Sequence, residues 1–151
     1  MAQFNSDSFE GLSNLPTNSH GGMVMSHRCA VIFPVNATVA IGDKFVLGKL
    51  PAGYTVQDIT ADTDGITGLT VNVVQTNSLI DAGATKTTLA PSISLATAGG
   101  EIAGTMSKDA VRFKGSNNDL FLVAEVTAGG SVTKGQEVGV TVTYRYRQAT
   151  Y

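Results

Sequence analysis

Hydrophobic and polar residues alternate along most of this chain, with the period of two that is typical of a strand with one buried face. Two stretches, "GLTVNVVQT" (68–76) and "MVMSHRCAVIF" (23–33), have this spacing, although His27 interrupts the second. The clearest run lies near the end of the sequence, where every second residue is Val or Tyr: Val138, Val140, Val142, Tyr144 and Tyr146. We expect a strand in each stretch.

Other stretches are rich in β-branched and apolar residues and are bounded by Gly, Pro or Asp, so they also have the composition of strands. No stretch shows a convincing helical period of 3.6 residues. The expected strands are 44–50, 54–62, 92–100, a short one around 110–114, and 119–126.

Two of these strands depart from simple alternation. In 54–62, Val56 and Ile59 have opposite parity, which predicts a β-bulge or a strand partly covered on both faces. In "DLFLVAEV" (119–126) both parities are apolar, so this strand is expected to be covered on two sides. The second cover is either the other sheet or a neighbouring subunit, and the sequence leaves both open.

About eight strands with a turn signal every ten or so residues predict an all-β, antiparallel sandwich or barrel over residues 23–151. Residues 1–22 differ, with isolated hydrophobic residues among Asn, Ser and Gly. Asp7 or Ser8 could cap a short helical turn there. The segment is either a loose terminus or an arm that lies on the domain or on a neighbour. We favour an extended arm, because it carries Phe4, Phe9, Leu12 and Leu15.

Composition narrows the function classes. A chain of 151 residues is expected to form one domain, and 42% hydrophobic with 15% charged residues is not the composition of a disordered protein. The net charge is −2 and the ten Lys and Arg residues are scattered, so direct nucleic-acid binding is not expected. No apolar run approaches the roughly 20 residues of a membrane helix. The start lacks a signal-peptide pattern, which predicts synthesis in the cytoplasm.

Residues suited to catalysis or metal binding are few. Cys29 is the single cysteine, so no intramolecular disulfide is possible, and we expect it to be buried. His20, His27 and Cys29 fall short of a zinc ligand set. "DTDG" (62–65) resembles the start of a calcium loop but is not followed by its Glu, so an ordinary turn is favoured. No nucleophile elbow or phosphate loop occurs. We expect no enzyme activity, metal or cofactor.

Two segments carry a family resemblance. They are "KLPAGYTVQDITADTD" (49–64) and "NNDLFLVAEVTAGGSVTKGQEVGVTVTYRYRQ" (117–148). Their order of turns and strands resembles the head decoration, or cement, proteins of tailed bacteriophages, over roughly residues 38–148. The resemblance implies a jelly-roll sandwich with no catalytic residues. It assigns scaffold positions to Leu50, Pro51, Ala52, Gly53, Tyr144 and Arg145.

The resemblance also implies a homotrimer on the outer surface of the virion capsid, seated between capsomers, with the major capsid protein as partner. We expect the interfaces to use hydrophobic residues of the arm and of strand 119–126, namely Phe4, Phe9, Leu12, Leu15, Phe121 and Val123. The main alternative is a carbohydrate-binding jelly-roll module of a phage tail spike or fibre, which the absence of Trp disfavours. A small shell-forming subunit is a second alternative, disfavoured by the short chain.

Overall fold

The computed structural model describes residues 3–7, 15, 24–81 and 83–146, and their regular secondary structure is almost entirely β-strand. One short helix, α2 (Lys108–Arg112), interrupts the strands. The strands are β1 (Gln3–Asn5), β2 (Val24–Ile32), β3 (Ala37–Val39), β4 (Lys44–Leu50), β5 (Tyr54–Thr63), β6 (Thr70–Thr76), β7 (Lys86–Ser94), β8 (Gly99–Ala103), β9 (Leu120–Ala128), β10 (Gly130–Val132) and β11 (Glu137–Tyr146).

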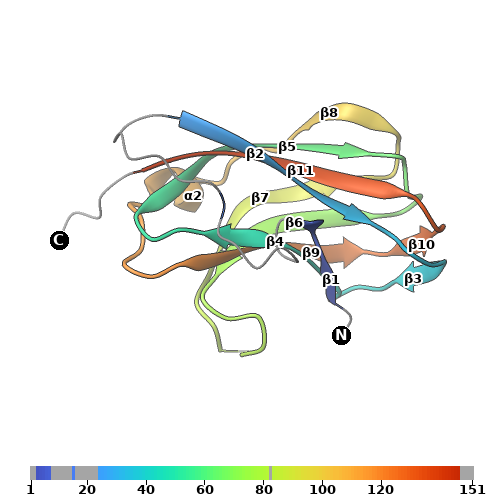
Figure 1. Ribbon diagram of the computed structural model, residues 1–151, viewed down its shortest axis with the longest axis horizontal. Helices are drawn as coiled ribbons and strands as arrows, with labels where there is room; N and C mark the ends of the chain where they lie inside the picture. The colour runs from blue at the N-terminus through green and yellow to red at the C-terminus, as the bar shows by residue number, and fades with distance from the viewer. Residues whose placement is uncertain (1–2, 8–14, 16–23, 82, 147–151) are drawn as a thin grey trace.

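The strands form two stacked sheets, seen one above the other in Figure 1. The upper sheet has the order β2-β11-β5-β8, and the lower sheet has the order β1-β4-β9-β6-β7. Leaving β1 aside, the chain passes between the sheets so that eight antiparallel strands pair as in a jelly roll. A short β10–β3 ladder extends one end, and β1 joins β4 in parallel at the sheet edge. The predicted jelly-roll-like sandwich is therefore confirmed.

The bulge predicted from the opposite parity of Val56 and Ile59 is present in β5. Thr143 of β11 lies opposite Asp58, but the next residue, Tyr144, lies opposite Val56. Gln57 is therefore the extra residue of the bulge, and it restores the phase of the strand. As a result, both Val56 and Ile59 are buried in the core.

Two of the expected strands were wrong in detail. Residues 110–114 do not form a strand, because Ser107 caps a helical turn at that point: its hydroxyl accepts a hydrogen bond from the N–H of Ala110 at 3.1 Å. Residues 92–100 do not form one strand either. β7 starts earlier and ends at Ser94, and β8 begins only at Gly99. The Thr-rich stretch before residue 92 belongs to β7, which agrees with the β-propensity of Thr and with the pairing to β6.

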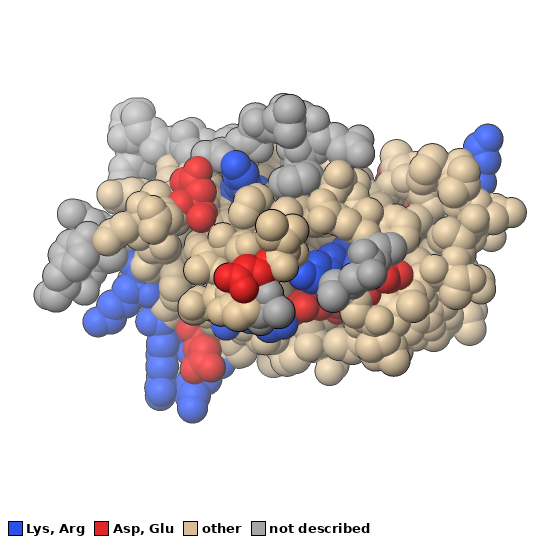
Figure 2. Space-filling model, turned by 90° about the horizontal axis from the view of Figure 1, so that it is seen from below, with Lys and Arg blue, Asp and Glu red and all other residues tan. Residues whose placement is uncertain are grey.

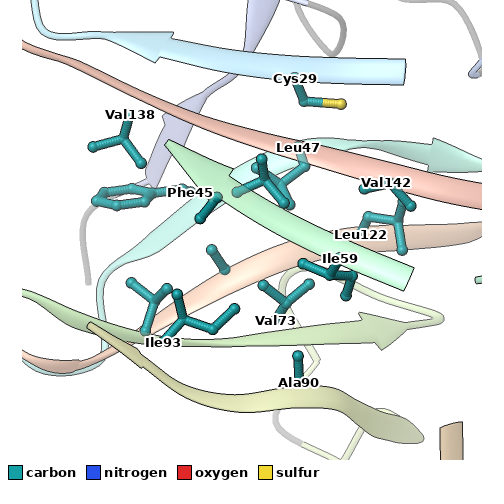
Figure 3. Close-up of a cluster of buried hydrophobic side chains, with 14 of the residues drawn as sticks. Cys29, Phe45, Leu47, Ile59, Val73, Ala90, Ile93, Leu122, Val138 and Val142 are labelled. Atoms are coloured by element: carbon teal, nitrogen blue, oxygen red, sulfur yellow. The ribbon is translucent and has the colours of Figure 1, made fainter. Parts of the chain in front are cut away.

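The core lies between the two sheets, where side chains from both point toward one another (Figure 3). β9 sits in the middle of the lower sheet, between β4 and β6. Its inward residues Leu122, Ala124 and Val126 belong to this core, and Val123 on the opposite face is also buried. The prediction that 119–126 is covered on two sides is confirmed, and the second sheet provides one of the covers.

Candidate interaction surfaces

The described part of the N-terminal segment lies on the edges of its own sandwich. Beyond the β1–β4 pairing, the N–H of Ser6 donates to the carbonyl of Val46 at 2.7 Å. Asp7 Oδ1 accepts the N–H of Ala30, on β2, at 3.0 Å. Further along, the N–H of Leu15 donates to the carbonyl of Lys49 at 3.1 Å. These bonds tie the segment to β4 of one sheet and to β2 of the other.

Phe4 closes the side of the sandwich between these two edges. Its ring makes edge-on contacts with Phe33 and Phe45, with centroids 5.5 and 5.6 Å away, a favoured geometry for aromatic pairs. Outside it runs an open groove of about 410 Å³ between β1 and the end of β2. The groove is lined by Gln3, Phe4, Asn5, Asp7, Ala30, Val31, Ile32 and Pro34.

The six residues expected at interfaces fall in different places. Phe4 and Leu15 lie along β4, and Leu15 is only 2% exposed. Phe121 and Val123 share the outer face of the five-stranded sheet, where Phe121 is half-buried and Val123 is 1% exposed. Phe9 and Leu12, like the helical turn expected after Asp7, lie outside the described residues. Contact of any of the six with a neighbour stays a prediction.

The outer face of the five-stranded sheet has an apolar centre. Val123 lies opposite Val46 on one side and Val74 on the other, and all three are buried although they lie outside the main core. The side chain of Lys86 reaches across β6 to pair with Glu125 at 3.1 Å.

The β6–β7 loop stands over this apolar centre and leaves a pocket of about 180 Å³ between itself and the sheet. Figure 2 shows this side of the molecule. Acidic and basic side chains are interspersed near its centre, and most of the visible surface is uncharged. Such a face suits contact with protein better than contact with a polyanion.

The outer face of the four-stranded sheet carries an ion-pair network instead. Arg28 of β2 binds Asp62 of β5 at 2.5 Å and Glu137 of β11 at 2.7 Å. Between β2 and β5 its guanidinium passes over Gly139 of β11, where an added Cβ would lie 2.6 Å from the guanidinium. The hydrogen bonds to Asp62 and Glu137 raise the pKa of Arg28 above its already high usual value.

Sequence reasoning missed this network, because Arg28, Asp62 and Glu137 are far apart along the chain. One signal was present: a glycine in the middle of an otherwise regular β-strand often marks a close approach by another group. Gly139 interrupts the last strand in this way.

Of the residues considered for chemistry, Cys29 lies in the core, and Asp62 and Asp64 bind other strands of the sandwich. Cys29 is fully buried in the core, and His27 is half-buried on the same row of β2; His20 lies outside the described residues. In the 62–65 turn, Asp62 pairs with Arg28 and Asp64 Oδ2 accepts the N–H of Glu137 at 2.8 Å. Among the described residues, no three His, Cys, Asp or Glu side chains come close enough to hold a metal ion.

The Pro51-Ala52-Gly53 corner is a packing site for tyrosines. Gly53 has a φ of +85°, and a Cβ there would lie 2.6 Å from the Tyr146 ring, so only glycine fits. The ring of Tyr54 contacts those of Tyr144 and Tyr146 edge-on. Burial raises the pKa of Tyr144 to about 12. Because Tyr54 and Tyr144 are buried, they offer no platform for a sugar ring.

Comparison with known proteins finds two solved structures with a similar fold. No family model matches the chain, and no curated protein matches it. A chain from the solved "Capsid of Ralstonia phage GP4" has the same fold with a TM-score of 0.77 and 21% identity, covering 99% of this chain and 100% of that one. A chain from the "Cyanophage Pam1 capsid asymmetric unit" matches with a TM-score of 0.52 and 20% identity, covering 90% and 95%. Both likenesses show a shared fold.

The helices of the described residues give no membrane span. None of them has the length and apolar character needed to cross a bilayer.

Proposed function

We propose that this protein is a structural component of a tailed-phage virion, a decoration or cement protein that binds the outer surface of the assembled head. The observation that carries the proposal is the fold likeness to a chain of a phage capsid structure, which spans both chains almost completely. The turn-and-strand resemblance of residues 49–64 and 117–148 to decoration proteins points the same way.

The geometry supports a role performed by surfaces. Ion pairs or core packing engage the acidic and thiol side chains considered above, and the outer face of the five-stranded sheet is largely uncharged. A rigid sandwich that binds only the assembled shell stabilises the shell by mass action. The gain is about 2.7 kcal/mol per site at a hundredfold excess over the dissociation constant.

The partner in this proposal is the major capsid protein, and the protein acts as a homotrimer seated between capsomers. Three linked copies would engage adjacent capsomers together, which strengthens binding without new kinds of contact. Light scattering of the purified protein tests the trimer, and the expected mass is about three times that of one chain.

The decisive experiment mixes the purified protein with heads of the phage that encodes it, prepared without this protein. Mature, expanded heads and unexpanded shells are imaged side by side. Regular density on the outside of mature heads is the expected result, and the unexpanded shells are the matched control. Absence of density on both, together with clear binding on a glycan array, would favour the carbohydrate-binding alternative.

A further inference from the structure

The loop between β6 and β7 presents an isoleucine to solvent. Ile80 is 95% exposed, more than any other large hydrophobic residue among those described, and Ile41 follows at 75%. The loop extends below the five-stranded sheet in Figure 1, away from the body of the sandwich. Single exposed hydrophobic residues are common on protein surfaces, so exposure alone assigns no role. The construction of the loop makes Ile80 different.

Hydrogen bonds fix the tip of this loop around Ile80. The hydroxyl of Ser78 accepts the N–H of Asp81 at 3.2 Å, and it also receives the N–H of Ile80 at 3.4 Å. Asp81 Oδ1 in turn accepts the N–H of Gly83 at 2.9 Å. Two consecutive side-chain turns therefore hold the backbone on both sides of Ile80.

Further bonds fix the base of the loop. The N–H of Asn77 donates to the carbonyl of Thr85 at 3.3 Å, which closes the loop across its neck. The Nζ of Lys44, on β4, donates to the carbonyl of Leu79 at 3.1 Å. Leu79, the residue before Ile80, is thus bound to β4 of the sheet, and the side chain of Ile80 projects into solvent from a hydrogen-bonded loop.

A fixed loop binds a partner with less loss of conformational entropy than a mobile one. An apolar side chain held in this way also gains its burial free energy in full when it enters a pocket. Aliphatic anchors inserted into pockets are a common form of protein–protein hot spot. The β6–β7 loop combines a hydrogen-bonded backbone with an exposed aliphatic side chain.

We infer that Ile80 is an anchor that inserts into an apolar pocket on the surface of a partner protein, which under the proposed function is the assembled phage shell. The loop sequence "NSLIDAGAT" (77–85) contains no aromatic residue to stack on a sugar. It contains no Lys or Arg to bind nucleic acid or an anionic membrane. Asp81 follows the anchor directly, so the pocket is expected to have a basic residue at its rim.

The test compares Ile80→Ser with Val111→Ser, a matched control because Val111 is also exposed but lies on α2, outside the groove and the β6–β7 loop. A third variant, Ile80→Leu, keeps an apolar anchor. Binding of each to mature heads is measured by co-sedimentation over a range of protein concentrations. Ile80→Ser is expected to bind roughly ten- to hundredfold more weakly, while Val111→Ser and Ile80→Leu stay close to the unaltered protein. All variants should keep the same thermal midpoint, because neither side chain is buried.

The outcomes separate this inference from the proposed function. If the unaltered protein binds heads and Ile80→Ser binds equally well, the anchor is overturned and the proposed function stands. If the unaltered protein does not bind heads, both are overturned. If Ile80→Ser lowers the mass of the free protein, the loop contacts another copy of this chain, which also overturns the inference. A photo-cross-linker attached at Ile80→Cys should form its adduct with a shell protein, and an adduct with a second copy would contradict the proposal.

Discussion

The two outer faces of the sandwich differ in the side chains that lie at their centres. On the four-stranded sheet, Arg28 joins Asp62 and Glu137 across a glycine, and the network is open to solvent. On the five-stranded sheet, the centre consists of buried valines, and a long loop stands over them. The first face carries charged side chains at its centre. On the second face, the β6–β7 loop lines a pocket together with two of the valines, and it also carries the most exposed large hydrophobic side chain of the described residues.

The two arrangements differ in energy. An exposed ion pair contributes about 0–1 kcal/mol to folding, whereas full burial of a valine contributes roughly 1.5–3 kcal/mol. The valine face should therefore matter more to stability than the charged face. The following predictions test this difference, beginning with the largest expected effect.

The largest effect is expected from a charge placed on each face. Val123→Asp buries a carboxylate between Val46 and Val74, so that neither neighbouring strand places a cationic residue directly across from it. The substitution should lower the free energy of unfolding by about 3 kcal/mol or more. Thr141→Asp places the same charge on the other face, beside Arg28, and should change it by less than about 1 kcal/mol. Urea denaturation measures both. Equal losses would show that the two faces do not differ.

Raising the pH distinguishes the contribution of the core to stability from that of the ion pairs. The pKa of Tyr144 is raised from 10 to about 12, so the folded state holds this proton more tightly than the unfolded state. Its stabilising effect is complete below pH 10 and is lost as the pH rises toward 12. Arg28 stays charged throughout, because its pKa is raised still higher. The thermal midpoint should therefore fall over this range, and it should fall less in Tyr144→Phe. An identical fall in both would assign the loss to other groups.

Gly139 tests how the ion pairs cross the sheet. A Cβ there would lie 2.3 Å from Asp62 Oδ1, so Gly139→Ala should displace Asp62 and Arg28 from each other. The expected loss is about 1 kcal/mol, the upper range for an exposed pair. Gly100→Ala, on β8, is the control, because no atom lies within 4 Å of the added Cβ. Calorimetry at low salt measures both, and no difference between them would mean that the bridge contributes nothing.

The smallest effect on stability is expected when one cationic side chain is removed from each face. Arg28→Ala removes contacts to two carboxylates, whereas Lys86→Ala removes contact to Glu125 alone. We expect a loss of up to about 1 kcal/mol for Arg28→Ala and at most about half of that for Lys86→Ala. Both losses should shrink in 1 M salt, where charges are screened within about 3 Å. A larger loss for Lys86→Ala would show that its aliphatic stem, rather than its charge, covers the valines.

Strand periodicity predicted most of the sandwich, because alternation reports directly which side of a strand is buried. The apolar row of β11 is buried from Val138 to Tyr144 as the alternation predicts, although Tyr146 at its end is exposed. The parity change between Val56 and Ile59 revealed the bulge at Gln57. Residues 110–114 were wrongly predicted as a strand because "AVRF" has strand composition. The N-cap at Ser107 instead favours a helical turn there. A capping bond involves few residues and leaves a weak signal in a hydrophobic pattern.

The candidate surfaces were harder to predict than the fold. The interface hypothesis selected hydrophobic residues, yet Leu15 and Val123 are covered by the chain itself. Ile80 was not selected, because the pair Leu79-Ile80 stands in a stretch of polar and small residues and has no periodic context. Its position depends on the bond from Lys44 to the carbonyl of Leu79 and on the bond between Asn77 and Thr85, which form only in the folded chain. The proposed anchor therefore depends on tertiary placement rather than on local pattern.

The parallel pairing of β1 with β4 has a consequence for how the protein is made. Residues 3–5 emerge from the ribosome early, but their partner, Lys44–Val46, is translated about forty residues later. β4 is itself held in its sheet by β9, which is completed only near residue 128. A three-residue strand cannot persist without that support. Residues 3–5 are therefore expected to reach their native pairing only after residue 128 has been synthesised.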